Sequence, residues 1–151
     1  MRGVSFTISS PKGRPLQQIL KCINIKKYRW YVIGSQNVTW DSSMEHLLFH
    51  CDAYEGNDFY EIINQDHFVI FLKLQAYNPE GSYDEILSYQ DFEKSDCQLL
   101  LLIHDCRNID MYLKNQTLIE KVYEYVAGNN SFQNIRYVCD DNDTRTKMCV
   151  V

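Results

Sequence analysis

The chain has 151 residues, of which 45% are hydrophobic and 23% charged, a composition typical of one globular domain rather than of a disordered, collagen-like or coiled-coil protein. The net charge of -5 at pH 7 and the lack of a basic stripe disfavour binding to nucleic acids or anionic membranes, which attract positive surfaces. The 11 Tyr, 7 Phe and 2 Trp form an aromatic excess that suits both sheet faces and contact surfaces.

A strand and a helix are predicted at the start of the chain. Residues 1–8 alternate polar and apolar side chains as a half-buried strand does. Pro15 suits the first position of a helix, because the amide hydrogen that proline lacks would have no partner there. Apolar side chains then follow at helical spacing, at Leu16, Ile19, Leu20 and Ile23. We expect this stripe to face a sheet.

A hairpin is predicted next. Residues 28–33 are dense in aromatic and β-branched side chains, residues 34–37 are typical of a turn, and residues 38–40 return as a second strand. This interpretation places Trp30 and Trp40 on facing strands, where they would pack across the hairpin.

A short helix is predicted from Ser42 to Cys51. Ser42 and Glu45 have the spacing of a capping box, and apolar side chains recur at helical intervals, at Met44, Leu47, Leu48 and Cys51. Residues 52–66 combine an acidic loop with a short apolar patch, and the pattern leaves their structure open.

The middle of the chain predicts a long strand over His67–Tyr77. Its apolar side chains share one face, while Lys73 and Gln75 indicate that the other face is partly in contact with water. Residues 78–81 have turn chemistry. Residues 83–95 are expected to be helical in part, because Ser82 and Glu85 repeat the spacing of a capping box.

The last third begins with a buried strand over residues 97–103, a turn, and a half-buried strand over residues 108–114. Asn115 is expected to cap a helix that ends at Gly128. A terminal hairpin is predicted from strands at residues 134–139 and 146–151, joined by an acidic connection that holds Asp140, Asp141 and Asp143.

These elements predict a single α+β domain over residues 1–151, with a mainly antiparallel sheet and three to four helices. Residues 3–40 and residues 108–151 share the order strand, helix, strand, strand. The shared order suggests a pseudo-repeat of two β-α-β-β units.

A cytoplasmic location and reduced thiols are expected. The N-terminal residues 1–8 lack the apolar core of a signal peptide, and the longest aliphatic run, Leu99–Ile103, is too short to cross a bilayer. The cysteines include no Cys-x-x-Cys pair and most lie in apolar patterns, so we expect free core thiols at Cys22, Cys51, Cys97, Cys106, Cys139 and Cys149.

His46 and His50 are the weak candidates for a metal site. They are four residues apart in the predicted second helix and are followed by Cys51 and Asp52. On a helical wheel both histidines point away from the apolar stripe that Cys51 joins, so the three side chains could not easily bind one ion. Two solvated histidines are the simpler interpretation, and we assign no metal and no cofactor.

His104, Asp105 and Cys106 combine residue types of nucleophilic catalysis, but neighbouring strand residues point to opposite faces and do not form a ready hydrogen-bonded pair. A hairpin turn explains them better. The acidic residues at Asp140, Asp141 and Asp143 lack the glycine and the terminal glutamate of a calcium loop, so a hairpin connection is preferred there too. No catalytic residue is assigned.

Four segments together resemble a protein family: residues 3–6 (Gly-Val-Ser-Phe), the set Ile19, Leu20, Tyr28, Trp30 and Tyr31, residues 94–101, and residues 143–146 (Asp-Thr-Arg-Thr). The chain is similar to a small uncharacterised family of Gram-positive bacterial proteins that is known only as a domain of unknown function. The resemblance spans nearly the whole chain and implies no activity or site residue.

Two functional hypotheses remain. The preferred one is a non-enzymatic cytoplasmic module that binds another protein through an acidic, tyrosine-rich surface, and it rests on acidity, aromatic excess and the lack of catalytic motifs. The alternative is a small-molecule binding domain with a cleft between the two β-α-β-β halves. An enzyme that uses His46, His50 or His104 ranks third.

Overall fold

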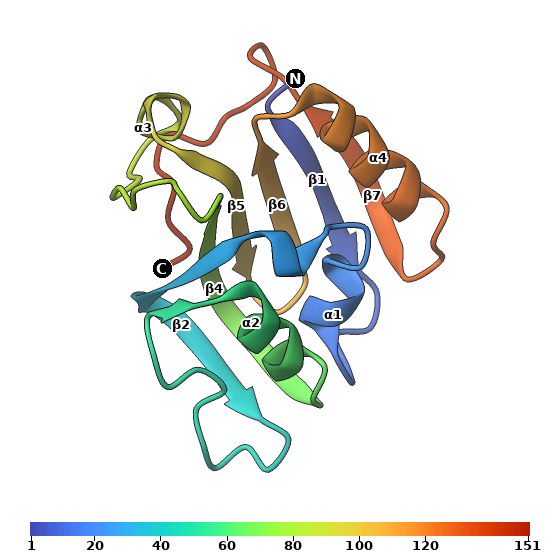
Figure 1. Ribbon diagram of the computed structural model, residues 1–151. Helices are drawn as coiled ribbons and strands as arrows, with labels where there is room; N and C mark the ends of the chain where they lie inside the picture. The colour runs from blue at the N-terminus through green and yellow to red at the C-terminus, as the bar shows by residue number, and fades with distance from the viewer.

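A computed structural model describes residues 1–151 and contains one seven-stranded sheet with the order β3-β2-β4-β5-β6-β1-β7 (Figure 1). All neighbouring strands pair antiparallel, so the α+β class and the mainly antiparallel sheet are confirmed. None of the helices combines the length and the apolar character needed to cross a membrane. The elements are β1 (Gly3–Ile8), α1 (Pro15–Ile19), a 3-10 turn η1 (Ile25–Lys27), β2 (Arg29–Asp41), β3 (Ala53–Tyr54), α2 (Gly56–Ile63), β4 (His67–Tyr77), α3 (Tyr89–Lys94), β5 (Cys97–His104), β6 (Asn108–Leu113), α4 (Gln116–Ala127) and β7 (Phe132–Val138).

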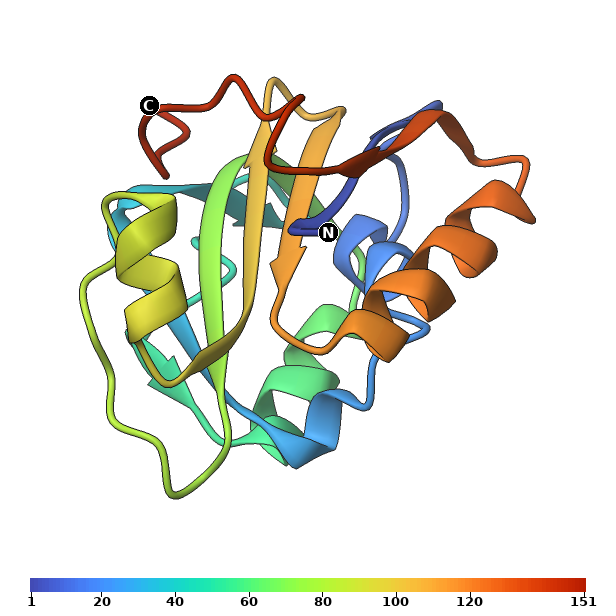
Figure 2. The ribbon, with the colours of Figure 1, turned by 90° about the horizontal axis from the view of Figure 1, so that it is seen from above.

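The two faces of the sheet are covered differently. Helices α1, α2 and α4 lie on one face, the helix face, where a core of 29 buried residues forms (Figure 2). The other face, named the tail face, is covered by α3, by the 78–88 loop and by the C-terminal segment, residues 139–151, with only 9 buried residues. The smaller core leaves more polar side chains of the tail face within reach of solvent.

The helix face is fixed by aromatic packing, and one of its helices, α4, has a side-chain cap. The ring of Trp30 stacks on Phe59 of α2 at 4.5 Å, and its indole nitrogen donates to the carbonyl of Ile25 at 2.9 Å. The predicted cap of α4 is confirmed, because the side chain of Asn115 accepts from the backbone N–H of Leu118 at 3.1 Å. The two contacts of Trp30 join η1, α2 and β2 into one unit.

The predicted hairpin over residues 28–40 is wrong, because β2 is a single strand of 13 residues. Both of its halves pair with β4, as Val32 lies opposite Leu74 and Asn37 opposite Leu72. Residues 33–36 are therefore a large bulge, with four residues opposite Lys73, rather than a turn. Trp30 and Trp40 lie on the same strand and do not face each other.

The predicted helix over residues 42–51 is also wrong. Met44 has a φ of 62°, which a right-handed helix does not allow, and Trp40 forms an isolated bridge with Leu47. The carboxylate of Asp41 accepts from the backbone N–H of Ser43 at 3.0 Å and from its hydroxyl. Such local side-chain hydrogen bonds replace the helical ones. The helix of this region is α2, within the stretch that the sequence pattern left open.

The terminal hairpin is a further incorrect prediction. Residues 146–151 form no strand, and β7 pairs with β1 instead. The C-terminal segment crosses the tail face, where the N–H of Met148 donates to the carbonyl of Leu87 at 3.0 Å and the N–H of Val150 donates to the side chain of Gln36 at 2.7 Å. A single strand follows the helix in each proposed half, so the pseudo-repeat of two β-α-β-β units is not confirmed.

Helix α3 confirms that residues 83–95 are helical only in part, although its start differs from the prediction. Ser88 and Asp91 form the capping box, whereas Ser82 and Glu85 do not. The predicted wet face of β4 is wrong as well. Lys73 is 2% exposed and Gln75 is 1% exposed, because the 78–88 loop and the C-terminal segment cover this part of the sheet.

Candidate functional site

Three tyrosines gather on the tail face near the end of the sheet formed by β2 and β4. The ring of Tyr31 lies 5.3 Å from that of Tyr77 in an edge-to-face arrangement and 4.8 Å from that of Tyr83. Tyr31 and Tyr77 belong to strands, while Tyr83 comes from the 78–88 loop. The loop therefore adds an exposed ring to two rings that the sheet holds in place.

These rings border a groove of about 300 Å³, named the tyrosine groove, which is lined by Tyr31, Val32, Ile33, Gly34, Asp52 and Tyr83. The bulge of β2 supplies Ile33 and Gly34, and a Cβ atom at Gly34 would lie 3.7 Å from Oδ1 of Asp52, an ordinary van der Waals contact. Asp52 is held in place because its carbonyl accepts from the N–H of Val32 at 2.8 Å. The irregularity of β2 thus opens the groove.

The groove is acidic. Tyr83 is 43% exposed, and the carboxylates of Asp52, Asp84 and Glu85 are exposed and form no ion pair. Partial burial, together with the negative charges of Glu85 and Asp52, raises the pKa of Tyr83 above its ordinary value. The phenol is therefore neutral at pH 7, and the groove offers aromatic rings beside uncompensated negative charge.

The 78–88 loop is held to the sheet through its backbone. The hydroxyl of Tyr77 accepts from the N–H of Asp84 at 3.1 Å and donates to the side-chain oxygen of Gln75 at 2.7 Å. The ammonium of Lys73 donates to the carbonyl of Ile86. The buried side chain of Ile86 adds to this anchoring. The carboxylates of Asp84 and Glu85 form no ion pair, and with the exposed part of the Tyr83 ring they are available for contact with a partner.

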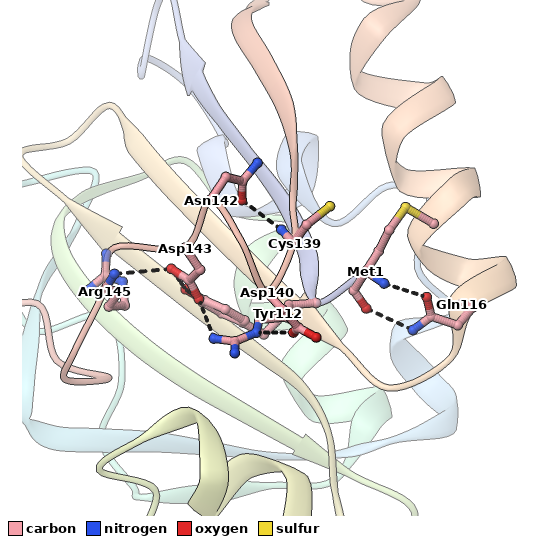
Figure 3. A network of polar contacts seen from close by, with 9 residues as sticks. Met1, Tyr112, Gln116, Cys139, Asp140, Asn142, Asp143 and Arg145 are labelled. Atoms are coloured by element: carbon pink, nitrogen blue, oxygen red, sulfur yellow. Dashed lines mark hydrogen bonds and ion pairs between the residues drawn. The ribbon is translucent and has the colours of Figure 1, made fainter.

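A second polar region lies where the C-terminal segment meets the N-terminus (Figure 3). The side chain of Asp143 is 3% exposed and accepts hydrogen bonds from Arg2 Nη1 at 3.1 Å, from the hydroxyl of Tyr112 at 3.2 Å and from the N–H of Arg145 at 3.2 Å. Asp140 also pairs with Arg2, at 2.7 Å. These acidic residues were predicted to form a hairpin connection, but they anchor the C-terminal segment to β1 and β6.

A polar cleft of about 390 Å³ lies beside this network and is named the cationic cleft. Its walls are the side chains of β6 and β7 on the tail face together with the C-terminal segment. The guanidinium of Arg145 pairs with Asp110 at 2.5 Å and also donates to the carbonyl of Cys149 at 2.9 Å. The lining residues are Asp110, Tyr112, Arg136, Val138, Asp143, Thr144, Arg145, Thr146, Lys147 and Cys149.

The histidines that the sequence singled out do not come together. His46 and His50 are exposed in the irregular segment after β2, so their spacing of four residues does not place them on one helix face. His46 contacts Asp41 at 3.3 Å. The structure brings no three His, Cys, Asp or Glu side chains into a group that could hold a metal ion.

His104 ends β5, and the positive φ angles of Asp105 (52°) and Cys106 (66°) form the tight turn to β6. The three side chains are thus part of a hairpin, as predicted. All six thiols are unbridged, but only Cys97 is fully buried and only Cys22 packs partly buried against the core of the helix face. The expectation of core thiols is therefore wrong for Cys51, which is exposed, and for the partly buried Cys106, Cys139 and Cys149.

The sequence pattern did not identify the individual residues that line the tyrosine groove and the cationic cleft. The tyrosine excess was the only signal for the tyrosine groove, and nothing in the local pattern joined Tyr31 to Tyr83, which lies 52 positions further along the chain. The cationic cleft had a signal in residues 143–146, a segment on which the family resemblance rests. Pairing of distant strands created both features.

The comparisons with known proteins agree with that resemblance. The family model described as a protein of unknown function (DUF2691) matches residues 1–149. The uncharacterized protein YncE of Bacillus subtilis is 33% identical over 152 residues, which cover 99% of each chain. No solved structure matches the chain.

Proposed function

The chain belongs to the DUF2691 family of unknown function, and we propose that it is a cytoplasmic, non-enzymatic interaction module whose tyrosine groove binds a Lys- or Arg-bearing segment of a partner protein. One observation carries the proposal: Tyr31 and Tyr83 form the walls of a groove of about 300 Å³ beside carboxylates that have no cationic partner.

Such a groove has the chemistry that recognises a cationic side chain. A Lys or Arg over a tyrosine face gains roughly 0.5–2 kcal/mol from the ring quadrupole, and more when water is excluded. Tyrosine is also enriched among the residues that dominate binding energy at protein interfaces. Asp52, Asp84 and Glu85 would supply the complementary charge and speed the encounter, because opposite charges steer association.

An absence of catalysis is part of the proposal and is supported by the chemistry of the groove. Its hydroxyl groups are phenols, and burial raises the pKa of Tyr83, which makes it a poor base or nucleophile at neutral pH. The cytoplasmic location is proposed from the reduced state of the six thiols.

A titration with a tetralysine peptide at low ionic strength tests the proposal. We expect chemical-shift changes in the amide spectrum at residues 31–34, 52 and 83–85. Tyr83→Ala should weaken binding about fivefold to thirtyfold, since an interface aromatic contributes on the order of 1–2 kcal/mol. The matched control is Tyr60→Ala, because Tyr60 on α2 is 38% exposed, close to the 43% of Tyr83.

The carboxylates are tested by the pair Asp84→Asn and Glu85→Gln. We expect weaker binding and a smaller salt dependence, whereas Asp58→Asn with Glu61→Gln on α2 removes the same charge elsewhere and should have little effect. A tetraglutamate peptide should not bind. Equal affinity of the wild type and Tyr83→Ala for tetralysine, or equal binding of the two peptides, would contradict the proposal.

A further inference from the structure

We propose that the cationic cleft binds a small oxyanion, a phosphate or a dicarboxylate, at a site separate from the tyrosine groove. The cleft is lined on one side by Arg136 of β7 and on the other by Thr144, Thr146 and Lys147 of the C-terminal segment. This inference does not depend on the proposed partner of the groove.

The cleft exists because β1 carries small side chains on the tail face. Val4, Phe6 and Ile8 are buried on the helix face, so alternation directs Gly3 and Ser5 to the tail face. Ser5 lies between Asp110 of β6 and Arg136 of β7 in the strand register, and Gly3 lies between Tyr112 and Val138. Small residues flanked by larger ones form a depression in the sheet surface.

The charges around this depression do not cancel. Asp110 is paired with Arg145, and Asp140 and Asp143 share Arg2. Arg136 and Lys147 are exposed and form neither an ion pair nor a side-chain hydrogen bond. The cleft therefore presents two cations without an ion-pair partner, although the whole chain carries a net charge of -5.

The surroundings of the two cations favour an oxyanion over a chloride-like ion. The hydroxyls of Thr144 and Thr146 can donate hydrogen bonds, and a guanidinium recognises phosphate or carboxylate with two parallel N–H groups. The volume of about 390 Å³ lies within the range of small-molecule sites, roughly 300–1,000 Å³. A ligand with two charged oxygen groups could reach Arg136 and Lys147 together.

The wall that carries the threonines and Lys147 is held rigidly. Asp143 fixes its start through Arg2 and Tyr112, and Met148, 1% exposed, fixes its end in the core of the tail face. The donors are therefore placed before a ligand arrives, which lowers the entropy lost on binding.

The test is a titration at low ionic strength with inorganic phosphate, and in a parallel arm with succinate. Chemical-shift changes should appear at Ser5, Arg136 and residues 144–147, and the arm with the tighter binding identifies the ligand class. Arg136→Gln with Lys147→Gln should weaken binding at least tenfold. The control Lys12→Gln with Lys121→Gln removes the same charge from exposed sites elsewhere and should leave binding unchanged.

The substituted side chains make no intramolecular polar contact, so both double variants should keep the melting temperature of the wild type in ligand-free buffer. In the wild type the melting temperature should rise with phosphate or succinate, because a ligand that binds only the folded state stabilises it. The inference is overturned if neither anion shifts the resonances of the cleft, or if both double variants lose affinity equally.

Discussion

Replacing Asp143 by Asn tests whether the buried carboxylate holds the C-terminal segment in place. The side chain of Asp143 is 3% exposed and accepts hydrogen bonds from Arg2, from Tyr112 and from the N–H of Arg145. Asn keeps the shape but removes the charge, and its NH2 group faces donors rather than acceptors. The guanidinium of Arg2 then keeps only the exposed carboxylate of Asp140.

The expected loss of stability is about 2–4 kcal/mol. Breaking a buried ion pair by changing one partner typically destabilises by roughly 3–5 kcal/mol, and the remaining pair of Arg2 with Asp140 reduces that figure. Full release of the segment would cost more than the ion pair alone, because it would also expose Met148, whose burial contributes roughly 1.5–3 kcal/mol.

Thermal and urea unfolding followed by circular dichroism measure this effect. For a chain of this length about 1 kcal/mol corresponds to a shift of roughly 2–4 °C, so we expect Asp143→Asn to lower the melting temperature by roughly 4–16 °C. Asp140→Asn is the matched control, because Asp140 pairs with the same Arg2 but its side chain is 88% exposed, where solvent weakens the interaction. The reasoning is refuted if Asp143→Asn has the same melting temperature as the wild type, or if the two variants lose equal free energy of unfolding.

Three further predictions concern single residues outside the groove and the cleft walls. Burial lowers the pKa of Lys73 below its ordinary value of 10.5, so the folded state releases this proton first and wild-type stability rises with pH between the lowered pKa and 10.5. Lys73→Met should lack this rise. In urea unfolding at pH 7 and pH 10, the free energy of unfolding of the wild type should therefore increase relative to that of Lys73→Met at the higher pH. Asn115→Ala removes the cap of α4 and should cost about 1 kcal/mol, measured by chemical denaturation, while Asn115→Asp should retain most of the stability. Gly3→Ala would place a methyl group 1.9 Å from the carbonyl oxygen of Met111, so it should destabilise by about 1–3 kcal/mol and raise amide exchange in β1 and β6; unchanged exchange there would show that the strand spacing can relax.

Local patterns predicted the central strands and the longest helix. Alternation over residues 1–8 and 108–114, the aliphatic run at residues 97–103, and the cap at Asn115 each depend on neighbours within a few positions. The helix predicted over residues 42–51 was wrong because the prediction also used neighbours alone. The capping-box spacing favoured a helix, but the hydrogen bonds from Ser43 to Asp41, which the spacing does not reveal, stabilise a turn instead.

The candidate sites were not predictable residue by residue. The alternating pattern predicts a wet strand face at Lys73, but this side chain is buried by the 78–88 loop and by the C-terminal segment, and the second of these lies far from it in the sequence. The same long-range contacts place Tyr83 beside Tyr31 and Lys147 across from Arg136. Composition indicated the tyrosine excess and the charge, but not where either gathers.

By itself the sequence determined the α+β class, the antiparallel strands of the sheet centre and α4, because periodicity and capping act over a single turn or a few strand residues. Only the tertiary structure decided that β2 is one bulged strand and that the last residues cross the tail face. The side chain of Met148 becomes buried only in the assembled tail-face core, among residues such as Tyr77 and Leu100 that lie far from it in the sequence. The physical reason is that burial of apolar area rewards contacts regardless of their separation along the chain, whereas the sequence pattern reports only near neighbours.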